Sequence, residues 1–507
     1  MVGHRPGACA LPVGTVVRLD RRALVLEGGS VLLGGAPPRM MFLAPAGAAL
    51  LAGGPSVTVT VTDATSAALA RKLLDAGIAH PTAAPPAAVP TAAAVPTAAE
   101  VTVVVPVRDR VEPLRRLLAA LDGLAVIVVD DGSAEPEAVG AVAEAAGARV
   151  LRRDRSGGPA AARNAGLAAA GTPLVAFLDS DVVPEPGWLA ELLPVFADPA
   201  VGLVAPRIVA LGPVTGWLGR YEAVRSSLDL GPDEALVVPR SRVAYVPSAA
   251  MLVRRAAVGA GFAADMRVAE DVDLVLRLHE AGWRVRYRPA SRVAHDHRTT
   301  PLQWWLRKAY YGTGAAPLSL RHPGSVPPMV LSASGAAIAG LVLLARPRSV
   351  LAALVVAVVS TERTARRLTR LRRPRTTAVR LVGLGAVGTI AQAADAVTRH
   401  YWPLSVLACL VSRRARRRVL AVALLEGMVD WWRHRGRDPR ARPGPLGYLL
   451  ARRLDDLGYG AGLWWGALRR GTVEPLRPVG VGTEHTRGGR TDRTTRKGPD
   501  GSAPTQG

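Results

Sequence analysis

The sequence predicts an α/β fold in which helices cover a central sheet. Three apolar, β-branched runs are typical of buried strands, at residues 101–105, 126–129 and 174–178. Helical patterns occupy the intervals between and beside them, at about 112–122, 135–147 and 159–170. Strands that alternate with helices indicate βαβ units and parallel pairing.

Acidic residues follow each of the three runs. Asp109 comes shortly after the first, Asp130 and Asp131 follow the second, and Asp179 and Asp181 follow the third. Ligands of such sheets bind beyond the carboxyl ends of the strands. We therefore expect these carboxylates to lie along one rim.

Length and composition allow a large core. The chain has 507 residues, 49% hydrophobic and 21% charged, which suits two or three domains. Its two cysteines, Cys9 and Cys409, predict neither a disulfide framework nor a cysteine metal site, and they fit a reducing compartment. Charged residues interrupt residues 1–30, so we expect no cleaved secretory signal.

The chain is strongly basic. Its 64 Lys and Arg against 40 Asp and Glu give a formal charge of +24, which favours polyanions such as anionic lipid, phosphorylated substrates or nucleic acid. The sequence has no recognisable nucleic-acid module and no aromatic-rich stacking surface, so we expect no nucleic-acid partner. Coding bias toward Arg is the alternative explanation for part of the charge.

Composition divides the chain into five segments. They are a small α+β module (1–80), a Pro/Ala linker (81–99), the central α/β domain (100–324), a helical basic region (325–470) and a disordered tail (471–507). In the module, short apolar runs and an alternating run at 57–61 predict strands, and 65–76 predicts a helix.

The basic region contains apolar runs at 325–345, 350–359 and 381–394. The first carries no charged side chain over about 20 residues, a length that suits a membrane span. Arginine clusters flank the runs, so we expect association with an anionic surface on the cytoplasmic face of the membrane. Whether the runs span the bilayer or form buried or interfacial helices stays open at this stage.

Asp179-Ser180-Asp181 carries the clearest chemistry. Two carboxylates one residue apart can converge on a divalent cation, and hard oxygen ligands suit Mg²⁺ or Mn²⁺ when a diphosphate completes the shell. Taken alone, the motif is equally typical of a solvated turn with an N-cap Asp.

Five motifs together favour a functional site over a solvated turn. In order they are VVVPVRDR (from Val103), VVDDGS (128–133), GGPAAARNAG (157–166), FLDSD (177–181) and AEDVDLVLRL (269–278). This series resembles the inverting family 2 glycosyltransferases over about residues 100–300. The resemblance implies the GT-A fold, a Rossmann-like mixed sheet that binds a nucleotide-sugar donor.

The resemblance also implies a donor site. Pro106, Val107, Arg108 and Asp109 leave the first strand where the base and ribose would lie. Either Asp130 or Asp131 could accept the uracil N3–H, and the resemblance favours Asp131; a plain turn is the alternative.

A second part of this site is the start of a helix near Gly158, where the backbone can approach an anion closely. Arg163, one turn later, would hold a phosphate or a carboxylate of the Asp179/Asp181 pair. An exposed arginine on an alanine-rich helix is the alternative.

Roles in metal binding and catalysis follow from the same resemblance. Asp179 and Ser180 would contact the donor, while Asp181 and His295 would ligate Mn²⁺ or Mg²⁺, with His297 as a rival ligand. Asp271 would be the general base that deprotonates the acceptor hydroxyl. The alternative for Asp271 is a first-turn carboxylate stabilised by the helix dipole.

On the acceptor side, the resemblance suggests that residues 247–255 form a strand with room for an acceptor. Gln303-Trp304-Trp305 would be a sugar-stacking element.

A narrower resemblance covers most of residues 10–470. RVAHDHRTTP (292–301) and YYGTGAAPLSLRHP (310–323) are similar to the mycofactocin-system glycosyltransferases. This implies transfer of glucose from UDP-glucose to a small, peptide-derived redox cofactor. The N-terminal module is similar to peptide-recognition domains, with a packing appendage as the alternative.

Three other functions remain at this stage. A family 2 enzyme could act on cell-envelope lipid or polysaccharide, and a nucleotidyltransferase on a similar scaffold would release pyrophosphate. A basic membrane or nucleic-acid scaffold with a decayed enzyme fold is the non-enzymatic alternative.

Overall fold

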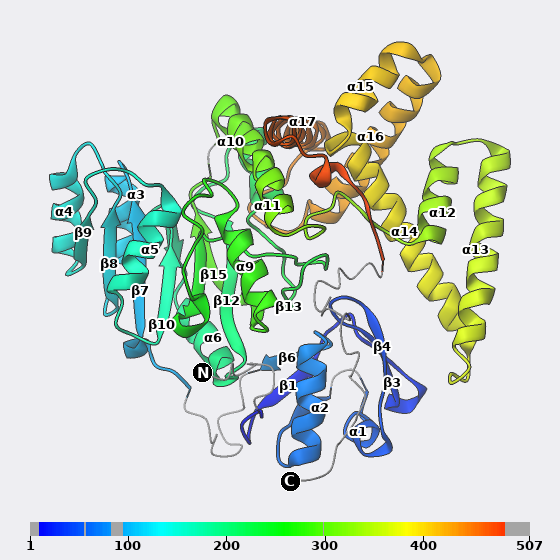
Figure 1. Cartoon of the computed structure of the whole chain (residues 1–507), viewed down its shortest axis with the longest axis horizontal. Coiled ribbons are helices and arrows are strands. Elements are labelled where there is room, and N and C mark those ends of the chain that lie inside the picture. Colours follow the sequence, from blue (N-terminus) through cyan, green and yellow to red (C-terminus); the bar gives the residue numbers. More distant parts are fainter. Residues whose placement is uncertain (1–9, 55–56, 83–94, 298, 482–507) are drawn as a thin grey trace, which may run out of the picture.

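The computed structural model of the protein describes residues 10–54, 57–82, 95–297 and 299–481. Three parts are visible in Figure 1: a sheet covered by helices, a small N-terminal module below it, and a set of C-terminal helices beside and above it.

A nine-stranded sheet forms the centre. Its order is β11-β15-β12-β14-β10-β7-β8-β9, and β13 pairs with β15. The strands are β7 (Val101–Val107), β8 (Ala125–Asp130), β9 (Arg149–Arg152), β10 (Leu174–Leu178), β11 (Val182–Pro184), β12 (Val201–Ala210), β13 (Ala235–Leu236), β14 (Ala250–Arg254) and β15 (Arg284–His295). β7, β8, β9 and β10 pair in parallel, whereas β14 runs antiparallel between β10 and β12. The sheet is therefore mixed, and the predicted α/β class is confirmed.

The three apolar runs of the sequence are the strands β7, β8 and β10. Their β-branched side chains are buried between helices on the two faces, as parallel strands require. The helices of this part are α3 (Val111–Ala119), α4 (Pro136–Ala145), α5 (Pro159–Ala169), α6 (Trp188–Leu192), α7 (Gly216–Arg225), α8 (Arg255–Val258), α9 (Glu270–Glu280), α10 (Pro301–Thr313) and α11 (Ala315–Arg321).

The N-terminal module contains two small antiparallel sheets and two α-helices. One sheet has the order β5-β1-β6 and the other β2-β3-β4. Their bounds are β1 (Val16–Leu19), β2 (Leu24–Leu26), β3 (Val31–Gly34), β4 (Arg39–Phe42), β5 (Thr58–Thr60) and β6 (Ala79–Thr82); α1 (Pro45–Ala49) and α2 (Ala64–Asp75) are the helices. α2 begins at Asp63, whose carboxylate accepts a hydrogen bond from the Ser66 N–H at 2.7 Å. β6 includes residues 81 and 82 of the predicted linker, and most of the remaining linker lies outside the described residues.

This module docks at the beginning of β12 and β15. Arg71 of α2 pairs with Asp198 at 2.8 Å, and Asp75 pairs with Arg284 at 2.8 Å. The module also reaches the middle of β15, where Arg288 donates a hydrogen bond to the Pro81 carbonyl at 3.3 Å. His295, at the far end of the strand, lies about 23 Å beyond Arg288.

The C-terminal helices are α12 (Ala333–Leu343), α13 (Pro347–Arg367), α14 (Pro374–Arg399), α15 (Trp402–Val411), α16 (Arg413–His434) and α17 (Pro445–Arg470). The uncharged stretch 325–345 does not form the 20-residue span that its composition suggested. It contains β16 (Val330–Leu331) and the 11-residue α12, which is too short to cross a bilayer. Among the described residues, α14 alone is long and apolar enough for a span, and that is a criterion of length and composition only.

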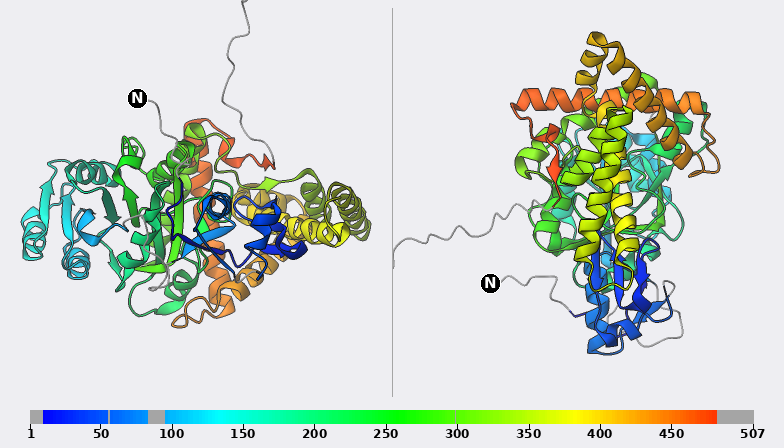
Figure 2. Two further views of the ribbon diagram at one scale, coloured as in Figure 1. Left: turned by 90° about the horizontal axis from the view of Figure 1, so that it is seen from below. Right: turned by 90° about the vertical axis from the view of Figure 1, so that its right-hand side faces the viewer.

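α17 crosses the top of the molecule and packs on α10 (Figure 2). Glycines permit this contact: a Cβ on Gly462 would lie 1.7 Å from the carbonyl oxygen of Ala309, and one on Gly312 would lie 2.1 Å from that of Tyr459. After α17, β17 (Val479–Gly480) pairs with β16, so residues 471–481 are ordered, contrary to the prediction of a tail disordered from 471 onward.

Buried ion pairs join the C-terminal helices to the centre. Lys308 of α10 pairs with Glu222 of α7 at 2.9 Å and lies 3.4 Å from Asp455 of α17. Arg399 of α14 contacts Asp455 at 3.0 Å and Asp456 at 3.1 Å. Loss of one partner of a buried ion pair strongly destabilises a protein, because the other charge is left buried and unpaired. The C-terminal helices are therefore an integral part of the fold.

Candidate active site

A cavity of about 570 Å³ lies beyond the carboxyl ends of β7 and β10. Its wall contains most of the residues that the sequence singled out: Pro106, Val107, Arg108, Asp131, Gly158, Arg163, Asp179, Ser180, Asp181, Asp271 and His295. The parallel topology brings these side chains together, because the neighbouring strands β7 and β10 end at the same edge of the sheet.

Asp109 and Asp130 are not among the residues that line this cavity. Asp130 is buried, accepts a hydrogen bond from the Ser133 N–H at 2.9 Å and pairs with Arg152. Asp109 accepts one from the Ala134 N–H at 2.7 Å. Both carboxylates therefore fix the turn after β8, and their expected contact with a nucleotide stays a prediction.

Asp131 lines the cavity, and its carboxylate organises the loop that precedes α5. It accepts hydrogen bonds from Ser156 Oγ at 2.8 Å, from the Gly157 N–H at 3.0 Å and from the Gly158 N–H at 2.8 Å. Arg153 Nε lies 2.8 Å from the same carboxylate. Four such partners stabilise the negative charge and hold the glycine loop against the cavity.

Gly158 allows the chain to enter α5 at this point. Its φ is 85°, a conformation that an L side chain rarely adopts, although open space would surround a Cβ there. Pro159 then begins the helix, with a ring that pre-sets the helical φ. The N-terminus of α5 thus opens onto the cavity, and the anion that already accepts from its Gly157 and Gly158 N–H groups is the Asp131 carboxylate.

Arg163 is buried and bridges two carboxylates. Its guanidinium donates to Asp179 at 2.6 Å and to Glu270 of α9 at 2.9 Å, and it packs over the Phe262 ring. Burial opposes its charge, but Asp179 and Glu270 keep the pKa of Arg163 above its usual value. Of the two partners expected for Arg163, the structure shows the carboxylate.

Asp181 and His295 meet because β11 pairs with β15, with Val182 opposite His295. His295 Nε2 lies 3.6 Å from the Asp181 carboxylate, which also pairs with Arg110. Burial opposes ionisation of Asp181, yet His295 and Arg110 hold its pKa below the usual value. His297, the rival ligand, is buried outside the cavity lining, and its Nδ1 lies 3.3 Å from that of His295.

This pair fits a divalent cation in its chemistry. A carboxylate oxygen and an imidazole nitrogen are both suitable ligands for Mn²⁺. Mg²⁺ prefers oxygen, so the imidazole nitrogen suits it less well. In the described part of the chain, no three His, Cys, Asp or Glu side chains form a metal-ligand cluster. Any cation held here would therefore need further ligands from a bound diphosphate and water.

Asp271 is held in the first turn of α9, next to Glu270. Its carboxylate accepts hydrogen bonds from the Ser248 N–H at 3.0 Å and the Val272 N–H at 2.8 Å. Burial, aided by the charge of Glu270, raises the pKa of Asp271 to about 6. Ala269, just before the helix, has a φ of 63°, so the chain enters α9 through a strained backbone. A carboxylate with such a pKa can accept a proton near neutral pH.

The sequence reasoning missed several residues of the wall. Arg110 pairs with Asp181 and Glu270 pairs with Arg163. The other lining residues that were missed include Tyr245, Arg307, Tyr310, Tyr311, Arg399 and Tyr459. Arg399 and Tyr459 come from α14 and α17, and the Arg399 guanidinium lies 4.1 Å from the centre of the Tyr459 ring. The basic, aromatic character of 307–311 was the available signal for part of this set.

Trp304 does not line the cavity, which corrects its expected sugar-stacking role. It is buried against Tyr221, and its indole N–H donates to Glu222 at 2.8 Å. The segment 247–255 is closer to expectation, because Pro247, Ser248 and Ala249 line the cavity immediately before β14.

Comparison with known proteins identifies the class. The family described as "Glycosyl transferase family 2" matches residues 102–259, which carry the donor-side motifs. ExoU, a succinoglycan biosynthesis protein of Rhizobium meliloti, is 27% identical over 234 residues, covering 40% of this chain and 66% of that protein. A mannosyltransferase of Pyrobaculum calidifontis, solved with GDP-Man and Mn²⁺, shares 18% identity over 71% of this chain and 87% of its own, with a TM-score of 0.35, too distant a likeness to bear on the site.

The nearer similarity extends over the whole chain. The pre-mycofactocin glycosyltransferases of two Mycobacterium tuberculosis strains are 49% identical over 478 residues, which cover 93% of this chain and 99% of those proteins. The chain therefore belongs to the pre-mycofactocin glycosyltransferase family, within the family 2 glycosyltransferases of GT-A fold.

Proposed function

We propose that this glycosyltransferase is an inverting, metal-dependent hexosyltransferase that moves glucose from UDP-glucose onto a peptide-derived redox cofactor of the mycofactocin type. The acceptor follows from the name and the 49% identity of the mycobacterial relatives. The observation that carries the chemistry is that one cavity contains Asp271, with its raised pKa, together with the Asp181–His295 pair.

The proposed reaction is a single displacement. The acceptor hydroxyl oxygen forms a bond to the anomeric carbon as Asp271 takes the hydroxyl proton. The bond from that carbon to the diphosphate oxygen breaks on the opposite face, and its electron pair leaves with the nucleoside diphosphate. One base and one displacement invert the anomeric configuration, with no carboxylate needed as a nucleophile.

Asp181 and His295 are the residues that would hold Mn²⁺ or Mg²⁺, and a bound cation would supply charge neutralisation for the leaving group. The protein itself contributes the glycine loop before α5, which Asp131 holds against the cavity. Arg163 keeps Asp179 and Glu270 in place, and Asp179 and Ser180 would contact the donor. Repeated transfer, which would build an oligosaccharide, is compatible with this arrangement and belongs to the same proposal.

The test combines protein, the redox-cofactor precursor, Mn²⁺ and a panel of nucleotide sugars, with mass spectrometry of the products. We expect UDP-glucose to add one hexose or more and to release UDP, and we expect the new linkage to be β by nuclear magnetic resonance. A hexose transferred only to lipid or polysaccharide would reassign the acceptor. Release of pyrophosphate would instead identify a nucleotidyltransferase.

Asp181→Ala tests the metal assignment separately. The variant should need a much higher Mn²⁺ concentration for half-maximal activity, whereas Glu112→Ala, an exposed carboxylate of α3, should not. An unchanged Mn²⁺ requirement in Asp181→Ala would show that the cation is held elsewhere.

A further inference from the structure

α16 turns an apolar face to the solvent. Six large side chains along one side of the helix are 36–66% exposed: Leu420, Leu424, Leu425, Met428, Val429 and Trp432. They recur at intervals of three and four residues, so they form one continuous stripe, about 18 Å long, which we name the α16 face. Soluble proteins seldom leave such a stripe uncovered.

Buried ion pairs fix this orientation. Glu426, on the opposite side of α16, pairs with Arg452 at 2.8 Å and also with Arg453. Asp430 pairs with Arg225 at 3.1 Å and accepts a hydrogen bond from the Tyr448 hydroxyl at 2.7 Å. Rotating the helix to bury its apolar face would break these contacts, so its outward position is built into the fold.

Arginines flank the α16 face at both ends. Arg413, Arg414, Arg416 and Arg417 precede it on exposed positions of the same helix, and Arg433 and Arg435 follow it. The acidic residues of the helix, Glu426 and Asp430, are the ones turned inward. The outward side of α16 therefore combines apolar surface with positive charge alone, the composition of helices that lie in the interface of an anionic bilayer.

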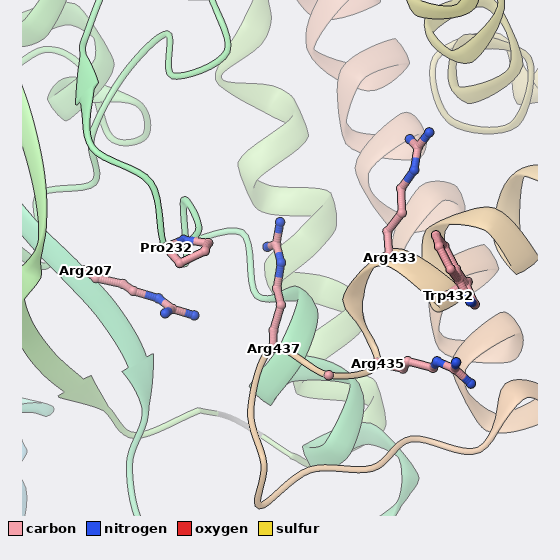
Figure 3. A pocket seen from close by; sticks show the side chains of 7 residues that line it. Arg207, Pro232, Trp432, Arg433, Arg435 and Arg437 are labelled. Carbon is pink, nitrogen blue, oxygen red and sulfur yellow. The ribbon is translucent and has the colours of Figure 1, made fainter. Parts of the chain in front are cut away.

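A basic pocket of about 520 Å³ adjoins the end of this face. Arg207, Arg433, Arg435 and Arg437 line it together with Trp432 and Pro232. Arg207 extends from β12 toward Arg437, and Arg433 and Trp432 stand on the far side of Arg437 (Figure 3). Within the described part of the chain, the carboxylate hydrogen-bonded to these arginines is Asp229, which accepts two hydrogen bonds from Arg207 at 2.8 Å.

Arg437 has an environment that favours an added anion. Burial and the nearby Arg225 and Arg207 lower its pKa, although Asp229 and Asp430 act in the opposite direction. A phosphate group between Arg207 and Arg437 would offset the repulsion between these two side chains, whereas Arg433 and Arg435, which point away from Arg437, would add positive charge at the rim (Figure 3).

We propose that the α16 face and the adjoining arginine pocket together form a docking surface for anionic phospholipid, with the apolar stripe in the acyl-chain boundary and a headgroup phosphate in the pocket. Trp432 lies at the junction of the two, where amphipathic rings favour the membrane interface. A stripe of about 18 Å is shorter than the bilayer core, so the helix lies on the membrane surface and does not cross it through α16. Charge selects lipid over a second copy of this chain, because two faces of the same positive sign repel each other.

Vesicle flotation tests this surface with the full-length protein. The probes are vesicles of phosphatidylcholine alone and of equal parts phosphatidylcholine and phosphatidylglycerol. The wild-type protein should float with the mixed vesicles, bind the neutral ones more weakly and lose the difference at high salt. Leu425→Ser/Val429→Ser should weaken binding to both about tenfold or more, since two buried aliphatic contacts are removed.

Two further variants sharpen the result. Arg433→Gln/Arg435→Gln should remove most of the preference for phosphatidylglycerol and leave the binding to neutral vesicles unchanged. Val13→Ser/Phe42→Ser removes two exposed apolar side chains of the N-terminal module, at the opposite end of the molecule from α15 and α16, and should float like the wild type.

The proposal is overturned if the wild-type protein floats with neither vesicle, or if Leu425→Ser/Val429→Ser floats as well as the wild type. A concentration-dependent dimer that this variant abolishes, measured by sedimentation velocity, would instead assign the face to contacts between copies of the chain. If Leu425→Ser/Val429→Ser unfolds at a lower urea concentration than the wild type, the proposal is judged on Arg433→Gln/Arg435→Gln alone, and an unchanged preference for phosphatidylglycerol in that variant overturns it. Glycosyl transfer to a soluble acceptor is expected to be unchanged in all of these variants, so a failure here is separate from a failure of the proposed function.

Discussion

The surroundings of Asp271 and Asp181 shift the pKa values of these two carboxyl groups in opposite directions. Asp181 is stabilised as an anion by His295 and Arg110, whereas burial and Glu270 raise the pKa of Asp271 to about 6. When two neighbouring carboxyl groups have different pKa values because of their environments, they can take different roles in catalysis. Under the proposed function, Asp271 is therefore the group suited to take the proton, and Asp181 is the group suited to hold a cation.

This difference predicts a pH dependence. A general base must be deprotonated, so kcat/KM should rise with pH, about tenfold per unit below pH 6, and level off above it. Asp271→Asn should reduce kcat by about 10²-fold or more and abolish this limb in the residual activity. Steady-state rates between pH 5 and 8, with metal and donor saturating, measure both. Full activity in Asp271→Asn would show that Asp271 is not the general base.

Arg163 predicts a stability effect at the same scale. Arg163→Met keeps much of the side-chain volume but leaves Glu270, which is buried, without its cation. We expect the free energy of unfolding in urea to fall by about 3–5 kcal/mol. The matched control is Arg115→Met, which removes an exposed pair with Glu112 and should cost less than about 1 kcal/mol. Equal effects of the two substitutions would mean that the buried bridge contributes nothing beyond surface charge.

At the scale of elements, α10 and α17 link the cavity to the C-terminal region. α10 supplies Arg307, Lys308, Tyr310 and Tyr311 to the wall, and α17 supplies Tyr459. The glycines at their crossing set how closely the two backbones approach. The position of one side of the cavity therefore depends on a contact between helices that are about 150 residues apart in the chain.

Gly462→Ala tests this dependence. Its Cβ would lie 1.7 Å from the Ala309 carbonyl oxygen, which is backbone and cannot rotate away, so the helices must separate. We expect a loss of about 2–3 kcal/mol in the free energy of unfolding and a higher KM for the acceptor. Gly388→Ala of α14 is the control: open space surrounds its Cβ, and the better helix propensity of Ala should add up to about 1 kcal/mol. Wild-type stability in Gly462→Ala would show that the helices can shift at no cost.

At the scale of the whole molecule, local sequence patterns predicted some features and not others. The β-branched runs of β7, β8 and β10 and the apolar periodicity of α2, α3 and α5 are local, and each element appears within a few residues of its predicted position. β12 and β15 were not predicted, because mixed pairing depends on contacts between distant segments. Residues such as Arg452 and Arg399 made the C-terminal region look like a charged surface. Their long-range pairs with Glu426 and Asp455 bury these charges, and no local pattern predicts such pairs.

The cavity shows the same division. Asp131, Asp179, Asp181 and Asp271 lie in motifs with a fixed local spacing, so their place on the rim could be predicted. Arg399 and Tyr459 could not, since no local pattern distinguishes them and only the packing of α14 and α17 brings them to the wall.

The N-terminal module gives the last prediction, because it is attached to the first half of β15, about 23 Å or more along the strand from His295. Arg71 donates two hydrogen bonds to the buried Asp198, at 2.9 and 2.8 Å. Arg71→Met should weaken this docking by about 1.5–3 kcal/mol, the range for hydrogen bonds to charged groups. Amide hydrogen exchange in α2 should therefore speed up about tenfold or more, while the amides of β10 stay as protected as before. Lys72→Met, one residue along the same helix and outside the ion pairs described here, should change neither. Because the module is remote from the cavity, KM for the nucleotide sugar should be unchanged in Arg71→Met. A rise in that KM would show that the module and the donor site are coupled through β15.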